Sequence, residues 1–398
     1  MRILSWQFFL IYGSAATLGP YMALFLRDRG FGEIQIGHII GFSGWAIMLS
    51  PVVITGLADL KASPKWLLGG LSLLAALSVG GILVSVGYWP ILAFFFLFTL
   101  SYAAMSPLLD GLFFGVKKSR SLGGGRELHY TDFRVWGTYG YVVLLLLMFF
   151  PIRQTGAVSA ALLAGLICYI LIALGAMFIP EGQRDEVTKK VSVLPSKSAL
   201  VALLRRRSVL FTVAMFLLIC VSAGFHAIYP VYVVEELGLP SHWMSIVLML
   251  GSIVEIFWIL GVKSFEMRWG QRAVMLGAVF LTVVRFALLY AFPSLAVAVS
   301  TELLHGAMIC AMFVIPPSVL DDFANDGNRN SIQGVFTMLV IGGGRLVGAV
   351  LTGYVAEWDH RAVYLLYALI TTLALAILWV GFRPGVKEKF DALDARGD

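Results

Sequence analysis

Charged residues and cysteines are scarce in this sequence. Asp, Glu, Lys and Arg make up 13% of its 398 residues, about half the share of roughly 25% found in soluble domains. Its three cysteines, Cys168, Cys220 and Cys310, lie inside apolar runs without metal-ligand spacing, which excludes a disulfide framework and a cysteine metal centre. A 59% hydrophobic composition and a mean hydropathy of +0.88 indicate a protein that crosses a membrane many times.

Twelve apolar runs are each close to the ~20 residues that a membrane-spanning helix needs. We place the spans at approximately 6–26, 34–57, 67–86, 91–114, 133–150, 157–179, 208–234, 242–262, 273–291, 295–320, 331–355 and 362–380. Most of the 29 Lys and Arg residues fall in the loops after even-numbered spans and in the two ends of the chain. The positive-inside rule therefore predicts that both termini are cytoplasmic.

A charged stretch between the sixth and seventh spans divides the chain. We predict an all-α membrane protein of two six-helix bundles, with the boundaries 1–180, 181–207 for a cytoplasmic linker, 208–382, and 383–398 for a cytoplasmic tail. Asp59 and Lys61 follow the second span, and Glu266 and Arg268 follow the equivalent span of the second half. An acid followed by a base in both short turns predicts a gating latch at the helix ends.

The tenth span carries two ionisable residues in its interior. Glu302 and His305 are three positions apart and so share one helical face. With Glu255 of the eighth span and Arg285 of the ninth, they place two acids, a base and an imidazole in the second half. Burying such groups in hydrocarbon costs roughly 2.5–3.5 kcal/mol each on insertion scales. The pattern predicts proton coupling; a static network joining the three helices is the alternative.

In the first half, Asp110 lies in the fourth span and Arg134 opens the fifth. Because these spans are antiparallel, the two charges can lie at similar depth and lower the cost of burying each other. The carboxylate offers acceptors and the guanidinium a fork of donors, so the pair can also hold a polar ligand. The alternatives are a structural ion pair between helices and, for Arg134, a side chain that reaches the lipid headgroups.

Three further side chains lie deep in the spans. Tyr141 and Trp258 can stack on a ring-shaped substrate, although core packing explains them equally well. His226, near Tyr229 and Pro230, is more readily explained as a hydrogen-bonded histidine at a helix kink than as part of a site.

These residues carry a resemblance to a known family. Residues 134–138, Arg-Val-Trp-Gly-Thr, are similar to the Arg-x-aromatic-Gly motif that opens the fifth span in one branch of the major facilitator superfamily. That branch holds lactose permease, the phenylpropionate transporter and the nucleoside–proton symporters. Residues 107–110, Pro-Leu-Leu-Asp, resemble the Pro-x-x-Glu of lactose permease. The resemblance covers nearly the whole chain and implies the major facilitator fold.

The second half resembles the coupling residues of lactose permease, with departures. Glu255, Arg285 and His305 fall on its span-eight glutamate, span-nine arginine and span-ten histidine, and Tyr141 falls on the tryptophan that stacks on the sugar. Met308 stands where that permease has its proton-carrying glutamate, Glu302 stands where it has a lysine, and Trp258 replaces an asparagine. Galactoside specificity therefore does not carry over.

We expect a secondary active transporter that takes up a small organic solute, such as a sugar, nucleoside or aromatic acid, with protons by alternating access. The predicted substrate-binding residues are Asp110, Arg134, Tyr141, Glu255, Trp258 and His305, and the predicted proton-coupling residues are Glu255, Arg285, Glu302 and His305. We expect a monomer in the lipid bilayer of the inner membrane, with no cofactor, no metal, no nucleic-acid partner and no enzymatic activity. Efflux of drugs or metabolites and a non-transporting receptor are the alternatives.

Overall fold

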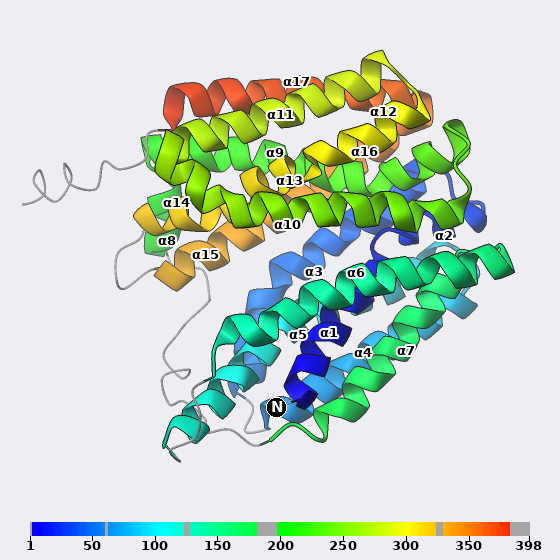
Figure 1. The fold of residues 1–398 in the computed structure, drawn as a ribbon, viewed down its shortest axis with the longest axis vertical. Coiled ribbons are helices and arrows are strands. Elements are labelled where there is room, and N and C mark those ends of the chain that lie inside the picture. The colour runs from blue at the N-terminus through cyan, green and yellow to red at the C-terminus, as the bar shows by residue number, and fades with distance from the viewer. Residues whose placement is uncertain (1, 60–62, 123–127, 181–196, 324–328, 383–398) are drawn as a thin grey trace, which may run out of the picture.

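The computed structural model describes residues 2–59, 63–122, 128–180, 197–323 and 329–382, and the regular elements within these ranges are all helices (Figure 1). The first half contains the helices α1 (Arg2–Leu18), α2 (Met22–Asp28), α3 (Glu33–Asp59), α4 (Pro64–Val84), α5 (Tyr88–Leu122), α6 (Tyr130–Thr155) and α7 (Ser159–Ala176). Lys61, most of the predicted linker and the predicted tail lie outside the described residues.

The second half has more and shorter elements. They are α8 (Lys197–Leu204), α9 (Arg206–Val231), η2 (Tyr232–Glu236), η3 (Ser241–Trp243), α10 (Met244–Trp269), α11 (Gln271–Ala291), α12 (Leu295–Ser300), η4 (Thr301–Leu304), α13 (His305–Ile309), η5 (Cys310–Val314), α14 (Pro316–Asp322), α15 (Arg329–Phe336), η6 (Thr337–Gly342), α16 (Gly343–Trp358) and α17 (His360–Gly381). The last part of the predicted linker is thus helical, as α8.

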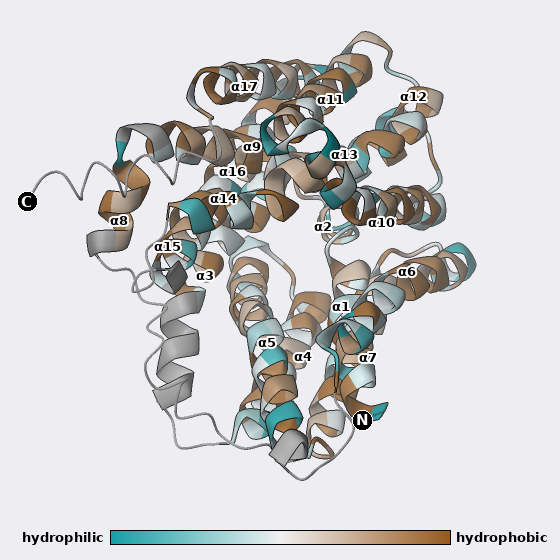
Figure 2. Cartoon of the chain, turned by 60° about the vertical axis from the view of Figure 1, so that its left-hand side comes forward, coloured by the Kyte–Doolittle hydropathy of each residue, from teal (hydrophilic) through white to brown (hydrophobic). Residues whose placement is uncertain are grey.

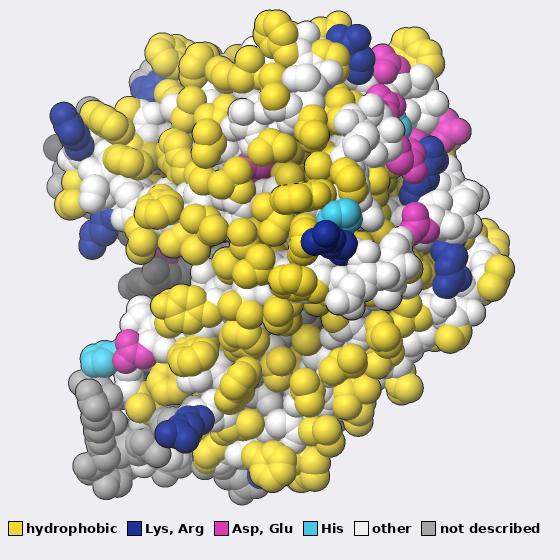
Figure 3. Space-filling view, turned by 45° about the vertical axis from the view of Figure 1, so that its right-hand side comes forward, with side chains coloured by type: hydrophobic (Ala, Val, Ile, Leu, Met, Phe, Trp, Pro, Cys, Tyr) yellow, Lys and Arg dark blue, Asp and Glu magenta, His cyan; other side chains and the backbone are white. Residues whose placement is uncertain are grey.

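These helices are long and apolar enough to cross a membrane, as the composition predicts. Eleven stretches within the described residues meet that criterion of length and hydropathy. Helix α3, with 27 residues, coincides with the second predicted span, so the twelve predicted spans all fall on helices. Large apolar side chains such as Leu77, Phe178 and Leu260 point outward and are 71–74% exposed. Hydrophobic side chains cover most of the face seen in Figure 3, as expected of a surface that contacts lipid.

The chain forms two bundles, one from α1 to α7 and the other from α8 to α17, which meet at one end and diverge toward the other (Figures 1 and 2). Helices α3 and α16 join them. A Cβ atom added at Gly37 would lie 2.6 Å from the carbonyl oxygen of Ala349, and one added at Gly44 would overlap the carbonyl oxygen of Gly342. Small residues at these positions are therefore required for the close approach of the two helices.

Aromatic side chains make a second contact between the bundles at the same end. The ring centroid of Phe149 in α6 lies 5.1 Å from that of His242 and 5.3 Å from that of Trp243. Both partners belong to η3, which precedes α10. We call this end of the molecule, where α2 and η2 also meet, the closed end.

Candidate functional site

The tenth predicted span is a helix in separate pieces rather than one regular helix. Glu302 lies in a 3-10 turn, His305 begins a short α-helix, and a π-helical turn follows at residues 310–314. Such departures from α-helical geometry change the direction in which side chains point, and π-helical turns are frequent at functional sites. The irregular backbone here directs both ionisable side chains toward α10 and α11.

Four ionisable side chains from three spans meet at this point, and we call them the central network. Arg285 is fully buried, and its Nη2 donates to Oε1 of Glu302 over 2.6 Å. Nη1 of Arg285 lies 3.0 Å from Nδ1 of His305. On the other side of the imidazole, Nε2 lies 3.8 Å from Oε2 of Glu255. The structure therefore brings together the four residues that the sequence predicts for proton coupling.

The contacts of the guanidinium determine where the proton of His305 lies. Arg285 has only donors, so Nδ1 of His305 must accept and carries no hydrogen. The neutral imidazole then carries its hydrogen on Nε2, the nitrogen that faces Glu255. The network thus ends in an N–H group directed at a carboxyl whose side chain is 28% exposed, whereas that of Glu302 is 1% exposed.

Two glycines allow α10 to approach the broken span. A Cβ atom at Gly251 would overlap a carboxylate oxygen of Glu302, and one at Gly306 would overlap the ring of Trp258. Trp258 therefore packs against the backbone of α13 at Gly306, as the core-packing alternative predicts, while its side chain remains partly exposed. A larger residue at either glycine would separate α10 from the network.

In the first half, Arg134 lies against an aromatic ring. Its Cζ is 3.8 Å from the centroid of the Tyr12 ring, a cation–π contact. The Tyr12 hydroxyl is in turn 2.6 Å from the Ser106 hydroxyl of α5. Gly137, one turn after Arg134, provides the space: a Cβ there would lie 2.6 Å from the Tyr12 ring. The sequence analysis did not single out Tyr12, because a lone tyrosine in an apolar helix carries no distinctive signal.

Asp110 accepts a hydrogen bond of 2.8 Å from the Tyr130 hydroxyl. It lies within electrostatic range of Arg134, but these two described residues form no ion pair in this conformation. The helix-joining ion pair that was one alternative for them is therefore not what the structure contains. Both side chains are partly exposed, and both satisfy their charges through tyrosines.

Tyr141 connects the two halves of the site. It lies on α6, contacts Ser252 of α10, and is within electrostatic range of Glu255 and Glu302. On its own side it is close to Tyr102, which lies near Tyr12 and Arg134. These side chains are partly exposed although they lie on the inner parts of the spans. The polar residues of the two bundles therefore face each other in the middle of the molecule.

His226 is a member of this region that the sequence analysis set aside. It is exposed, whereas the residues on either side of it in α9 are buried, and its ring centroid is 6.0 Å from that of His305. Its Nδ1 lies 2.7 Å from the carbonyl oxygen of Ser222, so Nδ1 donates and Nε2 of the neutral ring is a free acceptor. The predicted hydrogen-bonded histidine near Pro230 is what the Nδ1 contact shows; the exposure of the ring and its distance to His305 are features that this interpretation does not explain.

Of the four predicted latch residues, the structure describes the side chains of Glu266 and Arg268 alone. Lys61 is outside the described residues, as is the side chain of Asp59 at the end of α3. Glu266 and Arg268 lie in the last turns of α10, where Arg268 is 5.7 Å from the centroid of the Trp269 ring. Arg345 of α16 donates from Nε to the Ser43 hydroxyl of α3 over 2.7 Å and so joins the two helices.

Two helical bundles with polar side chains facing each other and charged side chains in their interior are typical of a membrane transport protein. Comparisons with known proteins agree. The chain is 26% identical to the nucleoside permease NupG of Escherichia coli, covering 92% of this chain and 91% of that one. It is 23% identical to the xanthosine permease of the same organism, covering 96% and 95%. The crystal structure of the nucleoside transporter NupG has a TM-score of 0.81 at 18% identity, covering 96% and 98%.

The model of one protein family, the "MFS_1 like family", matches residues 1–369 of the chain. The chain belongs to this family. It is a multi-pass membrane transporter of small molecules rather than an enzyme, and the predicted major facilitator fold is confirmed.

Proposed function

We propose that this transporter takes up nucleosides together with protons, by alternating access of one central site. The observation that carries the proposal is the central network, which runs from buried Arg285 and Glu302 through His305 to partly exposed Glu255. The similarity of the chain to a nucleoside permease and a xanthosine permease supports nucleosides as the substrate class.

The two carboxyl groups of the network suit different roles. Glu302 is held by Arg285 through a charge-assisted hydrogen bond of 2.6 Å and is screened from solvent. Glu255 has no guanidinium partner among the described residues, and its side chain is 28% exposed. We therefore assign the transported proton to Glu255 and give Glu302 the role of holding Arg285, which in turn orients His305.

The residues opposite Glu255 suit a ligand with both a flat ring and hydroxyl groups. Tyr141 and the partly exposed face of Trp258 can stack on a nucleobase. Arg134 and Asp110 offer donors and acceptors to hydroxyl groups, because their present tyrosine contacts can be exchanged for contacts with a ligand. The free Nε2 acceptor of His226 adds a position that can receive an N–H group.

The orientation follows from the basic loops. We place the protein in the inner membrane as a monomer with both termini in the cytoplasm, so that the closed end faces outward and the diverging ends of the bundles face inward. In this assignment Asp59, Lys61, Glu266 and Arg268 lie at the cytoplasmic turns, where they would form the predicted latch in the opposite conformation.

The proposal is tested with purified protein in liposomes, under an inward proton gradient, with radiolabelled uridine, inosine and xanthosine and with xylose as a solute of another class. We expect accumulation of at least one nucleoside that depends on the gradient. Glu255→Gln should abolish accumulation while retaining exchange of labelled for unlabelled nucleoside, because exchange does not require the proton to be released.

Asp132→Asn is the matched control, since this exposed carboxylate opens α6 far from the network, and it should transport normally. Nucleoside uptake that is indifferent to the gradient would refute symport. Accumulation of xylose alone would refute the substrate class, and full accumulation by Glu255→Gln would refute the assignment of the proton.

A further inference from the structure

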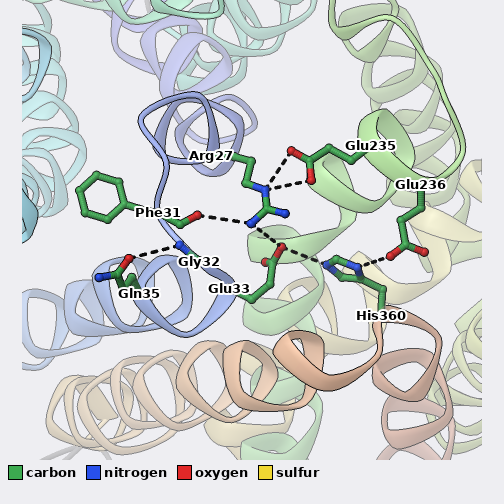
Figure 4. A network of polar contacts seen from close by, with 8 residues as sticks. All are labelled: Arg27, Phe31, Gly32, Glu33, Gln35, Glu235, Glu236 and His360. Atoms are coloured by element: carbon green, nitrogen blue, oxygen red, sulfur yellow. Dashed lines mark hydrogen bonds and ion pairs between the residues drawn. The ribbon is translucent and has the colours of Figure 1, made fainter.

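A second group of ionisable side chains joins the two bundles at the closed end (Figure 4). Arg27 of α2 places Nε 2.9 Å from both carboxylate oxygens of Glu235 in η2 and Nη1 3.6 Å from Glu33 at the start of α3. His360, the first residue of α17, lies between Glu33 and Glu236. We call these five residues the closed-end network. They come from both halves of the chain, and neither the sequence analysis nor the proposed function uses them.

Both ring nitrogens of His360 face a carboxylate. Nδ1 is hydrogen-bonded over 2.5 Å to Oε1 of Glu236. Nε2 lies 3.1 Å from Oε1 of Glu33, which is an ion-pair distance, but the two atoms are not aligned as a hydrogen bond. Carboxylates only accept hydrogen bonds, and a neutral imidazole carries one N–H and one lone pair. A neutral His360 would therefore direct a lone pair at one of the two oxygens, which repels it. While both carboxyl groups are ionised, both contacts are attractive at once only when the ring carries two hydrogens and a positive charge.

We propose that His360 is a proton-binding site separate from the central network, and that its proton holds the closed end shut by joining Glu33 of the first half to Glu236 of the second. The inference does not depend on the substrate or on proton coupling at Glu255. Loss of the proton from His360 breaks the contact with one carboxylate, and the only remaining charged contact between the halves in this network is Arg27 with Glu235.

The surroundings of His360 favour a cation. Beside Glu33 and Glu236, the acids near it are Glu357 and Asp359, which line the same pocket of about 330 Å³. The bases facing this region are Arg27, which contacts Glu33, and Arg361, the next residue of α17. Tyr232, whose ring centroid is 6.3 Å away, is the remaining titratable neighbour. Acids outnumber bases, and the side chains of Glu33 and His360 are only 5% and 10% exposed, so solvent screens their attraction weakly.

Because of where the closed-end network lies, the proton on His360 can control whether the two bundles separate at this end. Directly below it, α3 and α16 pack through Gly37 and Ala349, and Ala349 is 0% exposed. The two halves cannot separate at this end unless Glu33 leaves His360. While the imidazole is protonated and the carboxylates are ionised the closed end is held; raising the pH through the titration of His360 weakens it.

The test measures opening directly, without substrate or gradient. A single reporter, Ala349→Cys, is placed in a background in which Cys168, Cys220 and Cys310 are changed to Ala, and its labelling by a membrane-impermeant maleimide is followed in liposomes. Ser241→Cys, beside the pocket at the closed end, normalises for the pH dependence of the thiol reaction. We expect the normalised rate to rise several-fold between about pH 6 and about pH 8, the range in which histidine changes charge.

Two variants at position 360 decide the cause. His360→Gln should label rapidly at both pH values, because a neutral amide cannot donate charge-assisted bonds to two carboxylates. His360→Lys keeps a positive charge throughout and should label slowly at both. Glu236→Gln leaves the imidazole in place but removes one of the two negative charges beside it, so the rise in labelling rate should shift to lower pH. This variant replaces His360→Gln as the test if His360→Gln does not fold. An unchanged rise in His360→Gln, or no rise in the parent protein, would overturn the proposal.

Discussion

The two halves of this transporter satisfy their inner charges in different ways. In the second half, Arg285 and Glu302 are almost completely buried and bind each other over 2.6 Å. In the first half, Arg134 lies on the Tyr12 ring and Asp110 accepts from Tyr130, and both remain partly exposed. Two charged side chains that form a buried ion pair do not readily give up that contact for a contact with a ligand. Charged side chains that contact only aromatic rings and hydroxyl groups can replace these contacts with contacts to a ligand. We propose from this contrast that the second half handles the proton, and that the charges of the first half exchange their present contacts for contacts with the substrate.

The largest effect should come from breaking the buried pair. Arg285→Met leaves the buried Glu302 carboxylate without its guanidinium partner, with only His305 3.8 Å away, and loss of one member costs about 3–5 kcal/mol in comparable buried pairs. The double variant Arg285→Met with Glu302→Leu should recover most of that stability, because neither charge is then left alone. Unfolding midpoints in detergent measure both. If the single variant were as stable as the parent, the second half would not be held together by this pair.

A change at Arg134 should reduce affinity with little effect on stability. Arg134→Lys keeps the charge but loses the fork of donors, and hydrogen bonds to charged groups contribute about 1.5–3 kcal/mol, so the Kd for nucleoside should rise by about 10-fold to 100-fold. Equilibrium binding and the unfolding midpoint should be measured on the same sample. A fall in stability with unchanged Kd would make Arg134 structural and remove the contrast between the halves.

Packing around Glu302 can be disturbed without touching a charge. Gly251→Ala introduces a methyl group where a carboxylate oxygen now lies, and overpacking of this kind costs about 1–3 kcal/mol. We expect lower stability and impaired accumulation, since α10 must move away from the network. Gly277→Ala in α11 is the matched control, because a Cβ there meets nothing within 4 Å. Equal behaviour of the two variants would show that the glycine at 251 is not required.

The smallest effect should follow the loss of one hydroxyl in the first half. Tyr130→Phe removes the hydrogen bond to Asp110, whose net contribution is about 0.5–1.5 kcal/mol. Because Asp110 is partly exposed, water can replace the hydroxyl, and the unfolding midpoint should fall only slightly. A loss as large as that of Arg285→Met would mean that the first half holds its charges as rigidly as the second.

Much of the site could be predicted from residues within one span. Glu302 and His305 share a face because they are three residues apart, and acids or arginines in apolar runs mark a functional region because burial is costly. The partners could not be predicted. Tyr12 and Tyr130 were passed over because tyrosine is common in spans, and Glu33 and His360 because a charge at a span end usually contacts solvent or headgroups.

The amino-acid sequence by itself determined the twelve spans, the division into halves and the list of costly inner charges, since these depend on hydropathy and spacing along one helix. Only the tertiary structure decided that Arg285 binds Glu302, that His226 faces the centre, and that His360 joins the bundles. Those contacts depend on how separate helices cross, and glycines such as Gly44 and Gly251 set that approach through atoms far away in the chain.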